Sequence, residues 1–170
     1  EPPQKEAPKK QLSLSQFWFK GGKLGVSMVD VTSKPEVFRE ATAKGVIELK
    51  PETIRLIKEG RVEKGDPFTV AKIAGILAAK NTSSLVPLCH PLPITNVEVN
   101  LKIAGNSAVE VEATVKARAQ TGVEMEALAA VSAALLTVWD MTKRYEKDER
   151  GQYPSTSIGD IHVVRKVKKH

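Results

Sequence analysis

The amino-acid sequence predicts an α+β fold, and three features of the chain lead to this prediction. Apolar and polar residues alternate over 97–103 and, after a Gly105-Asn106 turn, again over 109–115. This period of two indicates a β-hairpin with one buried face. The stretch 121–147 instead has an apolar run bounded by charges, which indicates a long helix, and a last strand is expected at 161–167. A few strands with helices on one side favour a ferredoxin-like antiparallel sheet with helices packed on one face.

The other predicted elements lie before the hairpin and after the long helix. An extended stretch at 46–49 follows a Ser-Lys-Pro turn, and two helices come next. The first, at 51–60, begins with proline at a favourable first-turn position and ends on Gly60. The second, at 66–81, has apolar residues at helical spacing. The prolines of LVPLCHPLP at 85–93 disfavour a helix and predict an irregular segment, and 149–160 reads as a turn-rich loop.

Composition limits the class of protein. The chain has 170 residues, 26 of them basic and 20 acidic, and its formal charge of +6 indicates an anionic partner, either nucleic acid or a phosphorylated small molecule. Residues 1–25 are rich in proline, lysine and glutamate and predict a disordered arm, which leaves 26–170 as a single α+β domain. Without an apolar run of roughly 20 residues or a signal peptide, we expect a soluble, cytoplasmic protein. The single cysteine, Cys89, excludes an intramolecular disulfide.

Charges mark both ends of the predicted long helix. Thr121 and Glu124 fit a Thr-x-x-Glu capping box, in which each side chain accepts a hydrogen bond from a backbone N–H of the first turn. Lys143 in the last turn suits the negative end of the helix dipole. Neither rule explains Glu126 or Asp140, so these two carboxylates are candidates for a functional role.

Four stretches of the chain carry a family resemblance. They are MVDVTSKP at 28–35 with Arg39, KGDPFTVAKIAGILAAK at 64–80, LVPLCHPL at 85–92, and TGVEMEAL with TVWDMTK within 121–143. Together they resemble the cyclic pyranopterin monophosphate synthase family of molybdenum-cofactor (molybdopterin) biosynthesis, the MoaC family. The resemblance implies ferredoxin-like subunits assembled into a homohexamer of three dimers. It also implies a lyase that converts 3′,8-cyclo-7,8-dihydroguanosine 5′-triphosphate into cyclic pyranopterin monophosphate and pyrophosphate.

Matching these motifs residue by residue places the family's functional groups on this sequence. The resemblance implies a catalytic aspartate at Asp140 and essential lysines at Lys64 and Lys143. The candidates for binding the substrate are Leu88, Cys89, His90, Glu124, Met125, Glu126, Lys34, Arg39 and Lys166. The family's Lys-x-Gly-Gly-Lys-Ser-Gly tail is replaced by VVRKVKKH, in which Lys166 is the candidate for the tail lysine. The Thr-His pair that often precedes the Met-Val-Asp motif is missing, so no role transfers from its histidine.

The reaction implied by the resemblance requires proton transfers and stabilisation of a leaving pyrophosphate, which suit cations and an acid–base pair. Asp140 and Lys143 lie three residues apart, so on a helix the carboxylate can orient the ammonium. The same spacing also fits an ordinary surface ion pair. In an apolar or cation-rich pocket, the pKa of a lysine such as Lys143 or Lys64 falls enough for proton exchange near neutrality. A solvated loop stays open as the alternative for Lys64.

A structural role stays open for the other candidates too. His90, directed by its neighbouring proline, fits acid–base work or substrate hydrogen bonding, although a lone histidine is often structural. Cys89 is expected to be a small buried hydrophobic residue rather than a nucleophile. Lys34 and Arg39 fit either a triphosphate site or a solvated helix face. One cysteine and three histidines give no zinc-ligand spacing, so we expect no metal site and no cofactor, while Mg²⁺ accompanying the pyrophosphate stays open.

The spacing of the two unexplained carboxylates predicts an oligomer. Glu126 and Asp140 are fourteen residues apart, about 21 Å along a continuous helix, which is too far for one small substrate. We expect two sites per helix, each completed by the opposite end of a neighbouring subunit at a dimer interface.

The alternative class is a non-catalytic, basic ferredoxin-like RNA-binding module. Such a module predicts aromatic side chains on the strands, and none occurs over 97–115. A glycine-rich nucleotide loop is also missing. The sequence therefore favours an enzyme with a small-molecule substrate and with neither a nucleic-acid nor a membrane partner.

Overall fold

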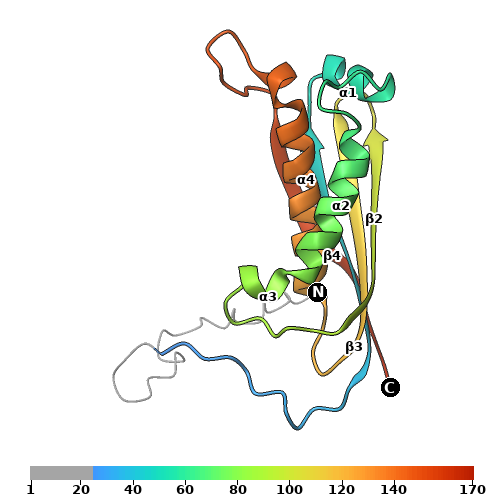
Figure 1. The fold of residues 1–170 in the computed structure, drawn as a ribbon, viewed down its shortest axis with the longest axis vertical. Coiled ribbons are helices and arrows are strands. Elements are labelled where there is room, and N and C mark those ends of the chain that lie inside the picture. Colours follow the sequence, from blue (N-terminus) through green and yellow to red (C-terminus); the bar gives the residue numbers. More distant parts are fainter. Residues whose placement is uncertain (1–24) are drawn as a thin grey trace, which may run out of the picture.

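The computed structural model describes residues 25–170, which form a four-stranded sheet with helices on one face (Figure 1). The elements, in chain order, are β1 (Val37–Glu48), α1 (Pro51–Lys58), α2 (Pro67–Lys80), α3 (Thr82–Leu85), β2 (Ile94–Ala104), β3 (Ala108–Ala119), α4 (Glu124–Glu146) and β4 (Ser157–Lys169). The strand order is β2-β3-β1-β4, and every neighbouring pair is antiparallel. This is the predicted ferredoxin-like α+β fold, which is confirmed. The predicted arm, residues 1–25, lies outside the described residues except for residue 25.

The predicted hairpin is formed by β2 and β3. Their register places Ala104 opposite Ala108, with a tight turn between them. Gly105 in this turn has φ +64°, a conformation that glycine adopts at no steric cost. The apolar residues of β3 are fully buried beneath the helices, as the alternation predicted.

β1 is longer than the sequence predicts. An extended stretch was expected only at 46–49, whereas the strand runs over 12 residues from Val37. The central inward-facing positions of β1 are alanines and Gly45, which give a weak hydrophobic signal. α4 approaches these positions closely, because a Cβ on Gly45 would lie 2.8 Å from Leu135 Cδ1 and 2.9 Å from Val131 Cγ1. Small residues in β1 therefore let the long helix pack against the centre of the sheet.

α4 is one continuous helix of 23 residues, as predicted, but its amino-terminal end differs from the prediction. The N-cap residue is Val123, whose side chain makes no capping hydrogen bond within the described residues. Thr121 lies outside the helix, and the carboxylate of Glu124 accepts a hydrogen bond from Lys166. The predicted capping box is therefore wrong, because the helix begins too late for Thr121 and a cation from another strand engages Glu124.

The remaining boundaries follow the predictions closely. α1 begins at Pro51, and Gly60 just beyond it has φ +65°. Asp66 caps α2 by accepting hydrogen bonds from two backbone N–H groups of the first turn. α3 is a single turn that was not predicted, and β4 begins at Ser157, within the predicted loop.

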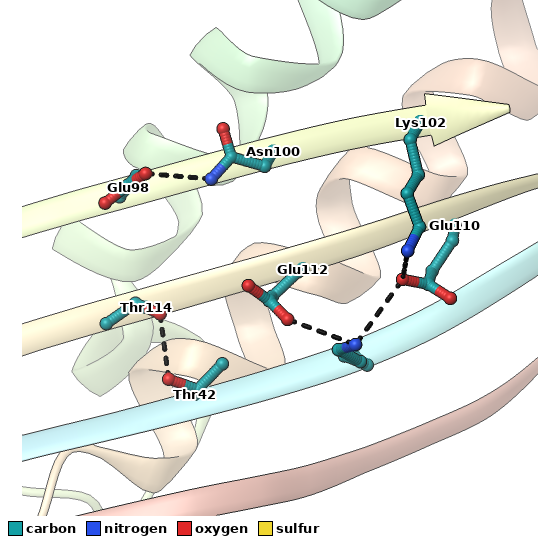
Figure 2. Close-up of polar contacts among 8 residues, drawn as sticks. Thr42, Glu98, Asn100, Lys102, Glu110, Glu112 and Thr114 are labelled. Atoms are coloured by element: carbon teal, nitrogen blue, oxygen red, sulfur yellow. Dashed lines mark hydrogen bonds and ion pairs between the residues drawn. The ribbon is translucent and has the colours of Figure 1, made fainter.

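The face of the sheet away from the helices is polar (Figure 2). Lys44 Nζ lies 3.2 Å from a carboxylate oxygen of Glu112 and 3.5 Å from one of Glu110, which also pairs with Lys102 at 2.8 Å. Figure 2 also shows the hydroxyl pair of two threonines on neighbouring strands, which are 2.8 Å apart. This face carries paired charges of both signs and does not form a uniformly basic surface for nucleic acid.

A buried carboxylate fixes the carboxyl-terminal end of α4. Glu146 is 0% exposed and accepts hydrogen bonds from the hydroxyls of Thr53 and Thr156 and from the backbone N–H of Lys50. Buried carboxylates are tolerated when such donors satisfy their oxygens. Glu146 thereby joins the end of α4 to α1, to Lys50 just before α1, and to the loop that leads into β4.

Among the described residues, α4 is the one helix long and apolar enough to cross a membrane by length and composition. Half of its most apolar window is buried, and the helix packs against α2, β1 and β3. This is the pattern of a core helix.

Candidate active site

Three charged side chains meet at the carboxyl-terminal end of α4. Asp140 accepts a hydrogen bond from Lys143 Nζ through one carboxylate oxygen and from Lys64 Nζ through the other, both at 2.7 Å. Lys64 Nζ also reaches the backbone carbonyl of Asp140 at 3.1 Å. Lys143 is on the same helix, whereas Lys64 comes from the turn between α1 and α2. The fold therefore brings together the three residues predicted to be catalytic.

The two lysines change the protonation chemistry of the carboxylate. Hydrogen bonds from Lys143 and from Lys64 lower the pKa of Asp140 to about 2, which keeps it ionised at neutral pH. The hydrogen bond to Asp140 in turn raises the pKa of Lys143. The expectation that the pKa of Lys143 falls is wrong in this chain, because a directly bonded anion favours the ammonium form. The three side chains are between 45% and 55% exposed, so a ligand can reach them.

A cavity of about 490 Å³ adjoins this cluster. Its lining residues are Glu63, Lys64, Asp140, Met141, Lys143 and Arg144. The surplus of cations around the carboxylate suits a phosphate-bearing ligand.

A second polar centre lies at the amino-terminal end of α4. The carboxyl of Glu126 is 2% exposed, and the Cys89 thiol donates to its Oε1 at 3.9 Å. Its Oε2 is buried, and residues 25–170 provide no hydrogen-bond partner for it. Burial raises the pKa of Glu126 and also that of the Cys89 thiol. Cys89 is therefore a protonated thiol beside a buried acid. It is only partly buried and lines a cavity, so the expectation of a buried hydrophobic residue is wrong.

A cavity of about 580 Å³ opens beside this centre. The predicted residues that line it are Lys34, Leu88, Cys89, His90, Glu124 and Met125. His90 Nε2 donates to the backbone carbonyl of Val29 at 2.8 Å, which fixes the ring against the segment before β1. The irregular segment predicted at 85–93 thus presents three consecutive side chains to one cavity.

The remaining cationic candidates lie around Glu124. Lys166 on β4 donates a hydrogen bond to its carboxylate, and Arg39 on β1 donates to the backbone carbonyl of Gln120 at 3.3 Å. Burial acts to raise the pKa of Glu124, but the hydrogen bond from Lys166 and the charge of Arg39 help to lower it overall. The Nε of Arg39 is buried, and no hydrogen-bond partner for it is found in the part of the chain that the structure describes. A Cβ at Gly122 would meet the Glu124 carboxylate, so a larger residue there would require this side chain to move.

The two centres are separate in one chain. α4 is unbroken between them, and the fourteen residues from Glu126 to Asp140 span about 21 Å. Cys89, His90 and Glu124 lie at one end of the helix, and Lys64 and Lys143 lie at the other. In residues 25–170, no group of three or more His, Cys, Asp or Glu side chains that could hold a metal ion is found.

Sequence reasoning missed several residues of these cavities. Val29, Val31, Thr121 and Gly122 line the first cavity and lie within the motifs that were quoted, so the motifs themselves were the available signal. Glu63, Met141 and Arg144 line the second. These three are sequence neighbours of predicted catalytic residues, and nothing in their residue types distinguished them.

A ferredoxin-like sheet that brings two lysines to one exposed carboxylate, beside a cavity, suits an enzyme of acid–base or phosphate chemistry better than a base-stacking module. Comparison with protein families matches residues 28–169 to the MoaC family, and the chain belongs to this family.

Curated relatives agree with this assignment. The chain is 57% identical over 146 residues to a probable cyclic pyranopterin monophosphate synthase of Pyrococcus horikoshii, covering 86% of this chain and 91% of the relative. The protein with the same name from Thermococcus kodakarensis is 58% identical over 144 residues, covering 85% and 92%. That from Saccharolobus solfataricus is 56% identical over 142 residues, covering 84% and 95%.

Proposed function

We propose that this protein is a cyclic pyranopterin monophosphate synthase of molybdenum-cofactor biosynthesis. It is a lyase that converts 3′,8-cyclo-7,8-dihydroguanosine 5′-triphosphate into cyclic pyranopterin monophosphate and releases pyrophosphate. The observation that carries the proposal is the meeting of Lys64 and Lys143 on Asp140 in a chain of this family. The names of its relatives support the same activity.

The charges of the cluster indicate a role for each group. Asp140 is ionised at neutral pH and orients both ammonium groups, so it does not supply a proton. Lys143 stays protonated because its pKa is raised, and it acts as the proton donor or as the cation that stabilises the leaving pyrophosphate. Lys64, on the other oxygen of the same carboxylate, adds a second contact for the phosphate oxygens.

The centre around Glu126 supplies substrate binding. In this proposal the Glu126 carboxyl, whose pKa is raised by burial, provides hydrogen-bonding oxygens for the amide edge of a guanine-derived ring. His90, Leu88 and Met125 shape the cavity, and Lys34 lines it on its other side. Lys166 and Arg39 lie next to Glu124, where they attract an anionic substrate.

One active site uses opposite ends of two α4 helices. In this proposal one chain supplies His90 and Glu126, and its neighbour supplies Asp140, Lys143 and Lys64. The expectation that Lys64 meets Asp140 from the other chain is wrong, because Lys64 contacts Asp140 within one chain. The assembly is a homohexamer, a trimer of dimers with sites at the dimer interface. The enzyme is soluble and cytoplasmic, with neither a nucleic-acid nor a membrane partner.

The test supplies the cyclised dihydroguanosine triphosphate to the purified protein. We expect the pyranopterin product by mass spectrometry and an equal amount of pyrophosphate, without added transition metal. Assays with and without Mg²⁺ decide whether this ion accompanies the pyrophosphate. Absence of product from a folded oligomer would refute the function. Activity that is lost on chelation and returns only with zinc would refute the metal-free mechanism.

A further inference from the structure

Lys64 lies in the turn 61–66 between α1 and α2. The side chain of Val62 is buried, and its carbonyl accepts a hydrogen bond from Gly65 N–H at 3.0 Å. Gly65 has φ +99°, which side-chain-bearing residues rarely adopt. Asp66 then caps α2. The turn is thus fixed at both ends, and Lys64 lies in its exposed part.

Two residues of α4 contact Glu63, the residue before Lys64. The hydroxyl of Tyr145 accepts a hydrogen bond from the backbone N–H of Glu63 at 2.9 Å. Arg144 forms an ion pair with the Glu63 carboxylate, but both side chains are 63% exposed, and such pairs contribute little. The Tyr145 side chain is half-buried and has only two flexible torsions, so its contact is the stronger restraint on the turn.

The lysine needs such a restraint to keep its contacts. Its ammonium reaches both a carboxylate oxygen and the backbone carbonyl of Asp140, although the side chain is 49% exposed. Ordering a long, exposed lysine side chain costs rotamer entropy. The double contact therefore depends on the Lys64 backbone staying close to α4, and Tyr145 lies on that helix five residues after Asp140.

We propose that Tyr145 is a positioning residue whose hydroxyl holds the 61–66 turn against α4 and so keeps the Lys64 ammonium on Asp140. This role rests on the proposed function, in which Lys64 is catalytic. Tyr145 lines neither cavity and contacts the reacting groups only through Lys64. The last two turns of α4 thus carry Asp140 and Lys143, and through Tyr145 they also position Lys64.

The first test needs no substrate and uses Tyr145→Phe in the full-length chain. Acetylation by a limiting amine-reactive reagent is quantified by mass spectrometry as the ratio of Lys64 to Lys143. We expect the ratio to rise about fivefold, because loss of one ordinary hydrogen bond permits about this increase in the population of Lys64 that is detached from Asp140. Amide exchange of the 61–65 segment should accelerate as well. Tyr153→Phe is the matched control, because it removes a hydroxyl for which no hydrogen bond is found among the described residues. It keeps the ring, which lies tilted against Trp139 with the ring centroids 5.5 Å apart.

The second test measures turnover. Tyr145→Phe should lower kcat about five- to tenfold with little change in KM, since the hydroxyl acts on a group used in the transition state. In the Lys64→Ala background the same substitution should have no further effect, because a residue that acts through Lys64 has nothing left to position.

The outcomes separate the two levels of the proposal. An unchanged acetylation ratio, or a loss of kcat that multiplies fully with that of Lys64→Ala, would overturn the positioning role. A natural chain that folds but does not turn over the substrate would overturn the proposed function, and the acetylation ratio would still decide whether Tyr145 holds Lys64. An equal effect of Tyr153→Phe would mean that the loss is a general weakening of this end of the molecule.

Discussion

The continuous α4 helix makes a sharp prediction about shared active sites. Glu126→Met removes the hydrogen-bonding carboxyl at one end of the helix, and Asp140→Asn damages the cluster at the other. Both substitutions nearly preserve side-chain volume, so we expect both proteins to fold and assemble. Each alone should lose at least about a hundredfold in turnover, the lower range for removal of an acid–base or charge-stabilising group.

The magnitude of recovery follows from geometry. The two centres are about 21 Å apart along α4, so they serve different sites in one chain. If two subunits complete each other's sites by two-fold symmetry, a mixed dimer carries both lesions in one site and none in the other. Random reassembly of equal amounts makes half of the dimers mixed, with half of their sites intact. Activity should therefore return to at most about a quarter of the natural level, by that two-fold reciprocity.

The assay dissociates the two variants, mixes them, reassembles them and measures pyranopterin formation. Subunit exchange is verified with a mass-labelled partner, and each variant reassembled with itself is the control. If activity stays at the level of those controls despite verified exchange, each site lies within one chain. One of the two carboxylates would then have a structural role only.

Three further predictions follow from the same structure. Lys64→Ala or Lys143→Ala should lower turnover by roughly two to four powers of ten. Either substitution should shift Tm by only a few degrees, because the side chains are about half exposed. A variant that unfolds would contradict the catalytic role. Burial raises the pKa of Glu126 above 4.5, so its ionisation destabilises the fold as pH rises from about that value through the folded pKa. Glu126→Gln should therefore gain Tm relative to the natural chain over this window, and parallel Tm curves would argue against a buried acid. Gly45→Ala should lower the free energy of unfolding, measured with denaturant, by about 1–3 kcal/mol, because the added methyl group overpacks the contact with α4. Gly159→Ala is the control and should be near neutral, since no atom of the described residues lies within 4 Å of the added Cβ. Equal effects of the two substitutions would refute the close approach of α4 to Gly45.

The sequence was sufficient for the fold class because most elements have strong local signals. The alternation in β2 and β3, the proline that begins α1 and the apolar run of α4 each indicate their structure without tertiary information. β1 was recognised only in part, since its small inward-facing residues matter through their contact with α4. The capping box at Thr121 failed for a similar reason, because Lys166 from another strand engages Glu124.

The candidate site could be predicted as a set of residues but not as an arrangement. The motifs placed Lys64 and Lys143 among the catalytic candidates, and the structure brings both to Asp140. The direction of the Lys143 pKa shift was predicted wrongly, because it depends on the distance to one carboxylate rather than on the composition of a pocket. Tyr145 had no signal at all, since its hydroxyl meets a backbone N–H that lies 82 positions away in the chain.

The buried Glu146 carboxylate separates the turn of α4 that carries Asp140 and Lys143 from the chain that follows it. The Thr156 hydroxyl donates a hydrogen bond to Glu146, the last residue of α4. The nine residues between them therefore form a loop whose two ends lie next to each other. The tip of this excursion, at Gly151, is exposed. Lengthening an exposed loop whose ends are already tied together costs little closure entropy. The tip is therefore a place where a reporter peptide can be inserted without displacing Lys143.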